Sequence, residues 1–134
     1  MKLTTRFRYG TRAVLDLAIH AAERPVSLKD IAQRQGISRK YLETLFSTLQ
    51  SSGIVRAVRG PRGGYRLTRK PEDISLRRLY EVLEGSGPLV DCTADPDICL
   101  RSASCVTQKV WEEMYNLCVG YLESISIQEL INRS

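Results

Sequence analysis

Residues 27–69 read SLKDIAQRQGISRKYLETLFSTLQSSGIVRAVRGPRGGYRLTR, and this stretch decides the fold. Ser27 precedes a short segment of apolar periodicity that ends at Gly36. Ser38 precedes a second such segment, whose apolar residues are Leu42, Leu45, Phe46 and Leu49. Serine is a preferred N-cap and glycine a preferred helix terminator. Two capped helices joined by a tight turn at this spacing predict a helix-turn-helix.

The second part of the stretch predicts a β-hairpin. Residues 54–58 are short and β-branched, residues 65–68 resume an extended pattern, and GPRGG at residues 60–64 is a turn. Alone, a Gly/Arg loop is as often a solvated turn. Directly after a helix-turn-helix it is typical of a winged helix, whose wing binds phosphates and probes the minor groove. The arginines of this hairpin are Arg56, Arg59, Arg62, Arg66 and Arg69.

Helices are expected on both sides of this unit. Residues 11–22 carry apolar residues at three- and four-residue spacing and predict a buried opening helix, which Pro25 follows. Residues 74–83 and 127–131 predict two further short helices. The expected fold class is mainly α with a small β-hairpin wing: a winged helix-turn-helix with a long C-terminal dimerisation helix.

The net charge divides the 134 residues into two halves. Residues 1–70 hold 15 Lys and Arg against 4 Asp and Glu (+11), whereas residues 71–134 hold 5 against 11 (−6). A basic region favours a polyanion, either nucleic acid or an anionic membrane surface. The helix-turn-helix and the wing decide between these two, and we therefore expect a region at 1–70 that binds double-stranded DNA. Residues 71–134 are expected to supply a cysteine loop and dimerisation helices within one compact, intertwined domain.

The outward face of the second helix is expected to enter the major groove. Arg39 and Lys40 suit phosphates or guanine edges. Glu43 could accept a hydrogen bond from cytosine N4 and so select cytosine, or it could be an exposed glutamate one turn from Arg39. The predicted DNA-binding residues are Arg39, Lys40, Glu43, Thr44 and Ser47 on this helix, and Arg59, Pro61, Arg62 and Gly63 on the wing.

Three of the four cysteines lie in one polar loop. Cys92, Cys99 and Cys105 have the spacing C-x6-C-x5-C, and three aspartates accompany them. Acidic neighbours disfavour a bare thiolate, and a bound metal or cluster would remove that conflict. The spacing lacks the close cysteine pairs of most zinc sites, and thiolates also suit iron-sulfur clusters. Cys118 is predicted to be a core residue, because it lies on the apolar stripe of a helix.

That helix, residues 106–125, is expected to join two copies of the chain. It has more apolar surface than so small a domain can cover, which predicts pairing in a homodimer. Two-fold symmetry would also suit palindromic DNA half-sites. The stripe consists of Val106, Val110, Met114, Leu117, Cys118, Tyr121 and Ile125.

His20 is the single histidine. It is expected to have its hydrogen bonds satisfied within the first helix rather than to bind a ligand.

Other classes of protein fit less well. The longest apolar stretch, residues 13–22, includes Asp16 and is shorter than the roughly 20 residues of a membrane span. An aspartate there also argues against export, so we expect a cytoplasmic protein with no membrane partner. No acid-base pair or phosphate loop points to an enzyme. An electron carrier would not need a basic head, and a DNA-coating protein would bind without sequence preference.

From end to end, the chain resembles the IscR/NsrR-type regulators of the Rrf-two family. The residues that carry the resemblance are RGPRGGY at 59–65, the helix-turn-helix at 28–49, the opening MKLTTRFRY and the three loop cysteines. The resemblance implies a winged helix with a crossed dimerisation helix. It also implies an iron-sulfur cluster, 2Fe-2S or 4Fe-4S, that Cys92, Cys99 and Cys105 hold. IscR has a glutamate at the position of Glu43, which implies a base-reading role.

The fourth cluster ligand departs from the family pattern. IscR has a histidine three residues after its third cysteine, where this chain has Gln108, and NsrR uses an acidic residue of the partner, where this chain has Arg8. Gln108, a nearby aspartate, a partner residue, a small thiol or nothing could be the fourth ligand.

The resemblance implies a homodimeric, sequence-specific transcription regulator, such as a repressor, that senses iron-sulfur, redox or nitric oxide status. The alternative is a cluster-free regulator that senses through cysteine oxidation, zinc or a protein partner.

Overall fold

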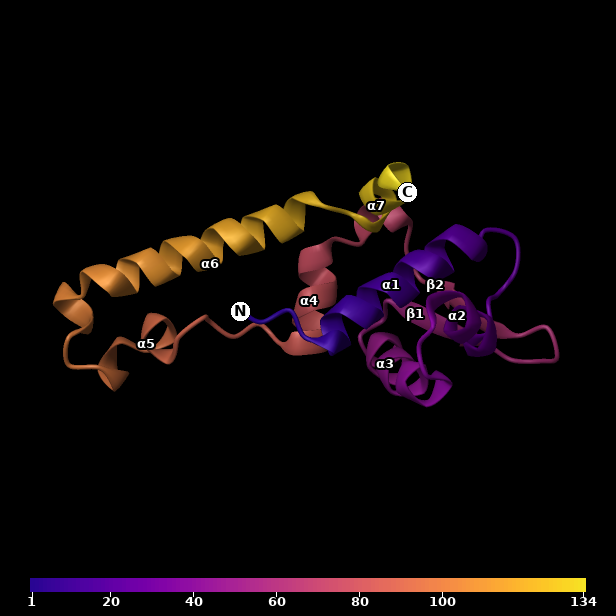
Figure 1. Cartoon of the computed structure of the whole chain (residues 1–134), viewed down its shortest axis with the longest axis horizontal. Helices are drawn as coiled ribbons and strands as arrows, with labels where there is room; N and C mark the ends of the chain where they lie inside the picture. The colour runs from indigo at the N-terminus through magenta and orange to yellow at the C-terminus, as the bar shows by residue number, and fades with distance from the viewer.

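Seven α-helices and a two-stranded antiparallel hairpin follow one another in the computed structural model, which describes residues 1–134 (Figure 1). This is the mainly α architecture with a hairpin wing that the sequence predicts. The elements are α1 (Thr5–His20), α2 (Leu28–Gln35), α3 (Arg39–Ser51), β1 (Val55–Val58), β2 (Gly64–Leu67), α4 (Leu76–Glu84), α5 (Asp91–Ala94), α6 (Val106–Ser124) and α7 (Ile127–Arg133).

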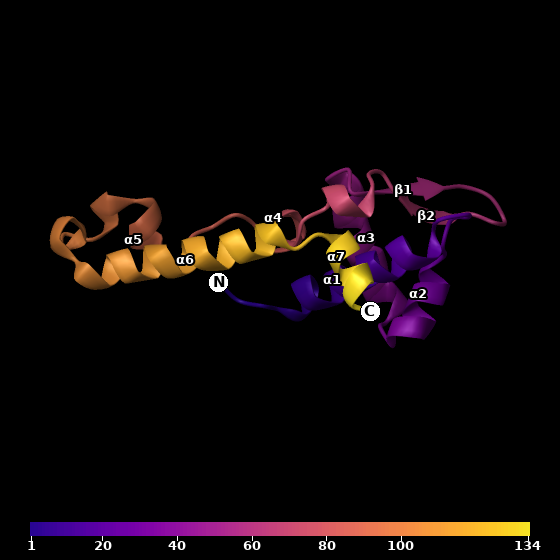
Figure 2. The ribbon, with the colours of Figure 1, turned by 90° about the horizontal axis from the view of Figure 1, so that it is seen from above.

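Residues 89–124 form an arm that extends from the rest of the molecule. The chain runs outward from the end of α4, passes through α5, and returns along α6, as both views show (Figures 1 and 2). No residue of α6 is buried. No helix of the structure combines the length and the apolar character that crossing a membrane requires.

The helix-turn-helix forms where the caps predict it. The hydroxyls of Ser27 and Ser38 each accept a hydrogen bond from the backbone amide three residues later, which fixes the first turns of α2 and α3. Gly36 ends α2 in the left-handed conformation, with φ at 63°. Ile37 fills the turn from beneath and is 5% exposed.

The first helix begins at Thr5 rather than at residue 11, and ends at His20. The hydroxyl of Thr4 accepts a hydrogen bond from the amide of Phe7 and caps the helix. Phe7 is buried and packs edge-to-face on Tyr80 of α4, with ring centroids 5.2 Å apart. Exposed basic side chains on both sides of Phe7 interrupt the apolar pattern, so periodicity alone placed the start too late.

One buried core joins the helices of the body to the hairpin. Phe46 of α3 lies edge-to-face on Tyr65 of β2, with ring centroids 4.9 Å apart. Tyr65 also exchanges two backbone hydrogen bonds with Val26. Gly64 approaches the Val26 backbone so closely that a Cβ atom would clash with it. The largest fully buried side chains include Phe46, Leu17, Ile31, Leu42, Leu45, Leu49, Ile74, Leu79 and Ile127.

The last helix returns the chain to this core. Ile127 donates a backbone hydrogen bond to Ile74 (2.9 Å), and Leu76 donates one to Ile125 (2.8 Å). The segments before α4 and α7 therefore lie side by side, with Ile125 and Ile127 buried. This contact anchors the C-terminal end of α6 to the body, while the opposite end lies far out on the arm (Figure 1).

Candidate DNA interface and cysteine loop

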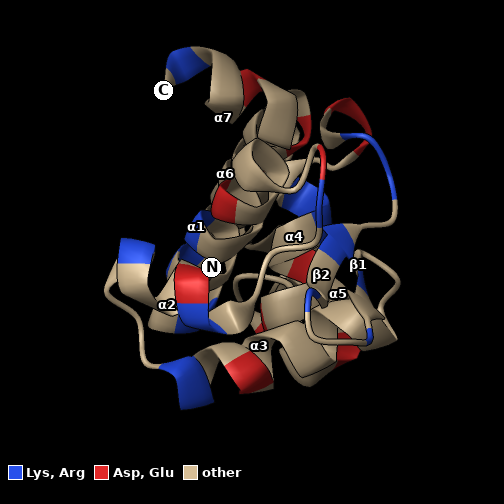
Figure 3. Cartoon of the chain, turned by 90° about the vertical axis from the view of Figure 1, so that its right-hand side faces the viewer, with Lys and Arg blue, Asp and Glu red and all other residues tan.

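The outward face of α3 is polar and fully available to a ligand. Its inward side chains, Leu42, Leu45, Phe46 and Leu49, are at most 1% exposed, which fixes the rotation of the helix. All five predicted DNA-binding residues of α3 are exposed: Arg39, Lys40, Glu43, Thr44 and Ser47. Figure 3 shows basic residues at the start of this helix, followed by an acidic turn.

Glu43 lies next to Arg39, as the helical spacing predicts. The distance from Arg39 Nε to Glu43 Oε1 is 3.7 Å, and both side chains are more than half exposed. A long, solvated ion pair of this kind contributes little free energy. The carboxylate therefore remains free to accept a hydrogen bond from a base.

The wing tip carries two arginines that form no ion pair within the chain. Arg59, Pro61 and Arg62 are exposed, and Gly63 is half-buried. Gly63 donates a backbone hydrogen bond to Gly60 at 2.9 Å, which closes the tip. The tip therefore presents its guanidinium groups outward, as a phosphate-binding wing requires.

Sequence reasoning missed Arg24. A groove of about 620 Å³ separates the wing tip from the start of α2, and Arg62, Arg24 and one acidic residue, Asp30, are among its lining residues. The N-terminus of α2, which carries partial positive charge, begins after Ser27 in the same wall. These groups together suit a phosphate of the DNA backbone. The signal in the sequence was the position of Arg24, shortly before a helix N-cap.

Arg66 does not have the phosphate-binding role that the hairpin pattern predicts. Its guanidinium donates hydrogen bonds to the carbonyl oxygens of Ala21 (3.2 Å) and Glu23 (2.9 Å). These carbonyls follow the end of α1 and would otherwise lack partners. Arg66 therefore attaches the hairpin to α1.

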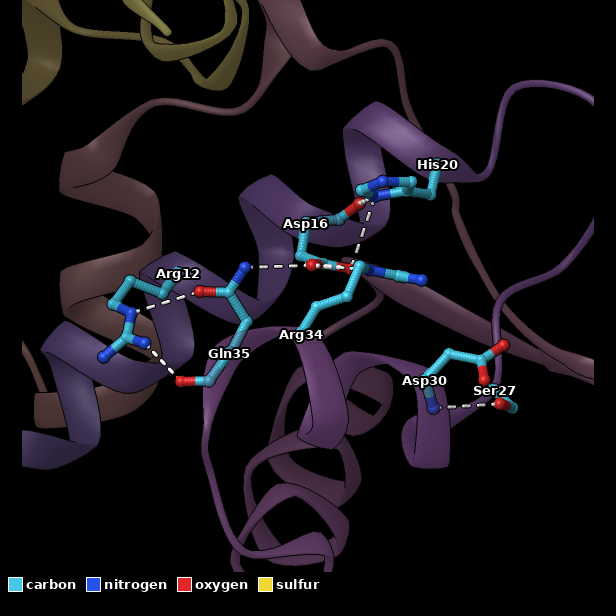
Figure 4. Close-up of polar contacts among 7 residues, drawn as sticks. All are labelled: Arg12, Asp16, His20, Ser27, Asp30, Arg34 and Gln35. Atoms are coloured by element: carbon cyan, nitrogen blue, oxygen red, sulfur yellow. Dashed lines mark hydrogen bonds and ion pairs between the residues drawn. The ribbon is translucent and has the colours of Figure 1, made fainter.

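A buried carboxylate connects α1 to the helix-turn-helix (Figure 4). Asp16 is 2% exposed, and it accepts hydrogen bonds from Arg34 and from Gln35 Nε2 (2.9 Å). Burial alone would raise the pKa of Asp16. The hydrogen bonds from Arg34 and Gln35, with the charges of Arg34 and His20, outweigh burial and hold that pKa below its ordinary value.

Two further residues complete this connection. Arg12 donates to the side-chain oxygen of Gln35 (3.2 Å) and to its backbone carbonyl, at the end of α2. His20 donates from Nδ1 to the backbone carbonyl of Asp16 at 2.9 Å, so the expectation that it is satisfied within the first helix is confirmed. The end of α2, which sets the entry to α3, is thereby held against α1.

The structure brings two of the three loop cysteines to one pocket. Cys92, Cys99 and Gln108 line a cavity of about 640 Å³ at the outer end of the arm. Cys105 is not part of that lining, and its Sγ lies 3.2 Å from Thr107 Oγ1. Hydrogen bonds from the Thr107 side chain, then from the backbone of Gln108, lower the pKa of the Cys105 thiol.

The cysteine loop fits an iron-sulfur cluster in the kind of donors it offers. No three histidine, cysteine, aspartate or glutamate side chains are grouped closely enough to hold a metal ion, so the thiols would have to converge on binding. The side-chain amide of Gln108 donates to the carbonyl of Cys92. Ser102 places a buried hydroxyl with no hydrogen-bond partner in the same pocket. Such hydroxyls can tune a cluster by hydrogen bonding to its sulfurs.

Cys118 is not a core residue, contrary to the prediction. It is half-buried, because α6 stands clear of the core. Cys118 and Tyr121 line an apolar pocket of about 420 Å³ together with Met1 and Leu3 from the start of the chain. The exposed apolar side chains of α6 are Val106, Val110, Trp111, Met114, Leu117 and Tyr121, with exposed fractions from 40% to 76%.

Comparisons with known proteins agree with this architecture. The chain is 44% identical over 131 residues to Protein rrf2 of Nitratidesulfovibrio vulgaris, covering 98% of this chain and 87% of that protein. It matches the solved structure of T. potens IscR at a TM-score of 0.82 with 39% identity, covering 99% of this chain and 88% of the other. It matches CymR (YrzC), the global cysteine regulator of B. subtilis, at 0.87 with 31% identity, covering 100% and 98%.

A family model described as "Rrf2: Iron-dependent Transcriptional regulator" matches residues 3–133. This match and the solved winged-helix relatives confirm the family resemblance that the sequence carries. They also place the chain among transcription regulators and not among enzymes. The chain therefore belongs to the Rrf2 family of transcriptional regulators.

Proposed function

We propose that the chain is a homodimeric, sequence-specific regulator whose cysteine loop reports iron-sulfur, redox or nitric oxide status to its DNA-binding heads. The observation that carries the DNA-binding part is that two exposed surfaces are built on one core. The polar face of α3 and the unpaired arginines of the wing tip belong to elements that share the same buried cluster. In this proposal residues 1–70 bind double-stranded DNA in the cytoplasm, and residues 71–134 sense and dimerise.

Each DNA contact has a distinct role in the proposal. Arg39, Lys40 and Glu43 read base edges in the major groove, where each base pair presents its own pattern of donors and acceptors. Arg62 at the wing tip and Arg24 before α2 hold backbone phosphates, which fix the position of the protein without reading sequence. Arg59 probes the minor groove.

The homodimer rests on the apolar face of α6. Leu117 is 75% exposed and Tyr121 60% exposed in the single chain, and both belong to the stripe that the sequence predicts. Contiguous apolar surface of this kind marks an interaction site. A second copy of α6 would cover it and would place two reading heads about a two-fold axis, as palindromic half-sites require.

Sensing is assigned to Cys92, Cys99 and Cys105, which would hold the cluster, with the fourth position open. When bound, an iron-sulfur cluster supplies a redox-active centre that reacts with oxygen or nitric oxide. The loop lies between α4 and α6, so drawing the three cysteines together would shift the start of α6. Since α6 carries the dimer contact, the angle between the two heads would change, and with it the affinity for an operator.

The cluster-free alternative rests on the position of Cys105. Its thiol faces Thr107 rather than the pocket of Cys92 and Cys99, and Gln108 stands where IscR has a histidine. In that case the thiols, a zinc ion or a protein partner would provide the signal, and the DNA-binding half would be unchanged.

Anaerobic purification tests the sensing proposal. We expect a brown wild-type protein that contains iron and acid-labile sulfide, and a colourless Cys92→Ala variant. The matched control is Cys118→Ala, which removes a cysteine outside the loop and should keep the colour. A colourless wild type after cluster reconstitution would support the cluster-free alternative.

Affinity for DNA tests the coupling. An operator is first selected from a random pool of duplex oligonucleotides, and its affinity is then compared for protein with and without the cluster. Different affinities are expected, because the cysteine loop precedes the dimerisation helix. Equal affinities would refute the coupling, and failure to enrich any sequence would refute the DNA-reading role itself.

A further inference from the structure

The base of the wing contains a pocket that the proposed function does not use. We call it the wing-base pocket, a cavity of about 290 Å³ between the end of α1 and the start and end of the hairpin. Its floor is apolar and includes Leu17, Ala21 and Leu67, and three arginines lie around it: Arg56, Arg66 and Arg69. Arg62 of the wing tip lines a different groove, together with Arg24.

The charges around this pocket have one sign. No acidic residue lines it. Arg56 and Arg66 stand directly opposite each other in the antiparallel ladder of β1 and β2, an arrangement that is destabilising for like charges. Arg66 is held by the carbonyl oxygens of Ala21 and Glu23, whereas Arg56 and Arg69 form no ion pair within the chain. An anion beside Arg56 would relieve this repulsion.

The floor of the pocket adds a second requirement. Leu17 is fully buried beneath it, and Ala18 and Ala21 of the same helix are half-buried. Because these side chains are small, they leave a hollow on the surface of α1 that can accept an apolar group. A hydrated phosphodiester would gain nothing from this floor, whereas an organic anion with an apolar body would bury surface there.

We propose that the wing-base pocket binds a small amphipathic organic anion. Its carboxylate or similar acidic group would lie between Arg56 and Arg69, and its apolar body would rest on Ala18, Ala21 and Leu67. A pocket of this size, at the lower limit of typical ligand sites, suits a compact molecule. Because Arg66 already attaches the hairpin to α1, the ligand would stiffen the same joint and so set the orientation of the wing.

Titration of the isotope-labelled full chain with benzoate and octanoate tests this proposal. Both probes should shift the amide signals of Ala18, Ala21 and Leu67 and should saturate, whereas benzamide, which has no charge, should not bind. In the double variant Arg56→Gln/Arg69→Gln, binding should weaken about tenfold or more, because two charge-assisted contacts are lost. The matched control is Arg77→Gln/Arg133→Gln, which removes the same charge from α4 and α7 and should bind normally.

A second variant keeps every arginine in place. Ala18→Leu fills the hollow with a larger side chain and should also weaken benzoate binding while leaving the DNA affinity unchanged. A dispersed amide spectrum for each variant shows that the fold is intact. This variant separates the contribution of the floor from that of the charges.

Several results would overturn the proposal. Absence of saturable shifts, or equal affinity in the Arg56→Gln/Arg69→Gln variant, would show that the arginines bind no organic anion. Inorganic phosphate that binds as tightly as benzoate would show that the floor contributes nothing. If Arg56→Gln/Arg69→Gln lowers both the affinity for DNA and its salt dependence, the two arginines belong to the DNA interface. The DNA-reading role of α3 stands in each of these cases, because Arg39 and Glu43 are untouched.

Discussion

Asp16 of α1 and Arg34 of α2 form a two-point ion pair. Arg34 Nε lies 3.0 Å from Asp16 Oδ2, and Arg34 Nη2 lies 2.7 Å from Oδ1. The carboxylate is almost completely buried, whereas the Arg34 side chain is 35% exposed. Because Arg34 lies one residue before the end of α2, the pair holds the start of the turn that leads to α3.

Asp16→Asn should lower the free energy of unfolding by about 1–3 kcal/mol. The change removes the charge that compensates Arg34 and weakens the hydrogen bond from Gln35, and partial exposure of Arg34 limits the loss. Urea denaturation measures it. The control is Glu81→Gln, which breaks the exposed ion pair with Arg77 and should cost less than about 1 kcal/mol. Equal losses in the two variants would contradict the structural role of Asp16.

The stability that Asp16 contributes should depend on pH. Its pKa in the folded state lies below the ordinary value of 3.8, so the folded state favours the ionised form. The contribution is therefore complete well above 3.8 and is lost as the pH falls through the folded pKa. Urea unfolding at several pH values gives the difference in the free energy of unfolding between the wild type and Asp16→Asn. This difference should be constant near neutral pH and should shrink below about pH 4. A difference that grows on acidification would contradict this sign.

Glu43→Ala should relax sequence preference at one base pair. A carboxylate in the major groove accepts a hydrogen bond from cytosine N4 and disfavours bases that have no donor there. The difference in binding free energy between cytosine and each other base should therefore shrink by about 1–3 kcal/mol in the variant. Binding of operator variants measures this. Glu72→Ala, which removes an exposed acid outside α3, is the control. Unchanged discrimination would reduce Glu43 to an exposed partner of Arg39.

Arg24→Gln should weaken DNA binding about equally for all sequences. A phosphate contact releases counterions on binding, so the slope of log affinity against log salt should fall by about 1 in magnitude. Fluorescence anisotropy at several salt concentrations gives the slope. Arg133→Gln on α7 makes the same charge change far from α3 and should leave the slope as in the wild type. A sequence-dependent loss would indicate base reading instead.

Leu117→Glu should prevent the proposed homodimer from forming at micromolar concentration. The leucine is 75% exposed in the single chain and lies on the apolar stripe of α6, so two opposed glutamates would repel each other in the dimer. Analytical ultracentrifugation distinguishes the states. Asn116→Glu adds the same charge off the stripe and should remain dimeric. A wild type that sediments as a monomer would remove the homodimer from the proposed function.

Local signals explain why the helix-turn-helix and the wing could be predicted. The hydroxyls of Ser27 and Ser38 accept hydrogen bonds from amides only three residues away, and Gly36 takes a left-handed conformation that glycine adopts at little cost. Such interactions join residues that are close in sequence, so the order of residues alone predicts them. The inward residues of α3 follow directly from helical periodicity, and with them the five side chains that face outward.

The sequence thus determined the family, the mainly α winged helix and the outward polar face of α3, because caps, turns and periodicity act over a few residues. Only the tertiary structure decided which polar residues meet across long separations. In the folded chain Asp16 pairs with Arg34, Arg66 donates hydrogen bonds to carbonyl oxygens after the end of α1, and Arg24 lines a groove beside the wing tip. It also left Cys118 outside the core, because α6 extends away from the body. Contacts of this kind depend on how helices pack, and no local pattern of residues encodes them.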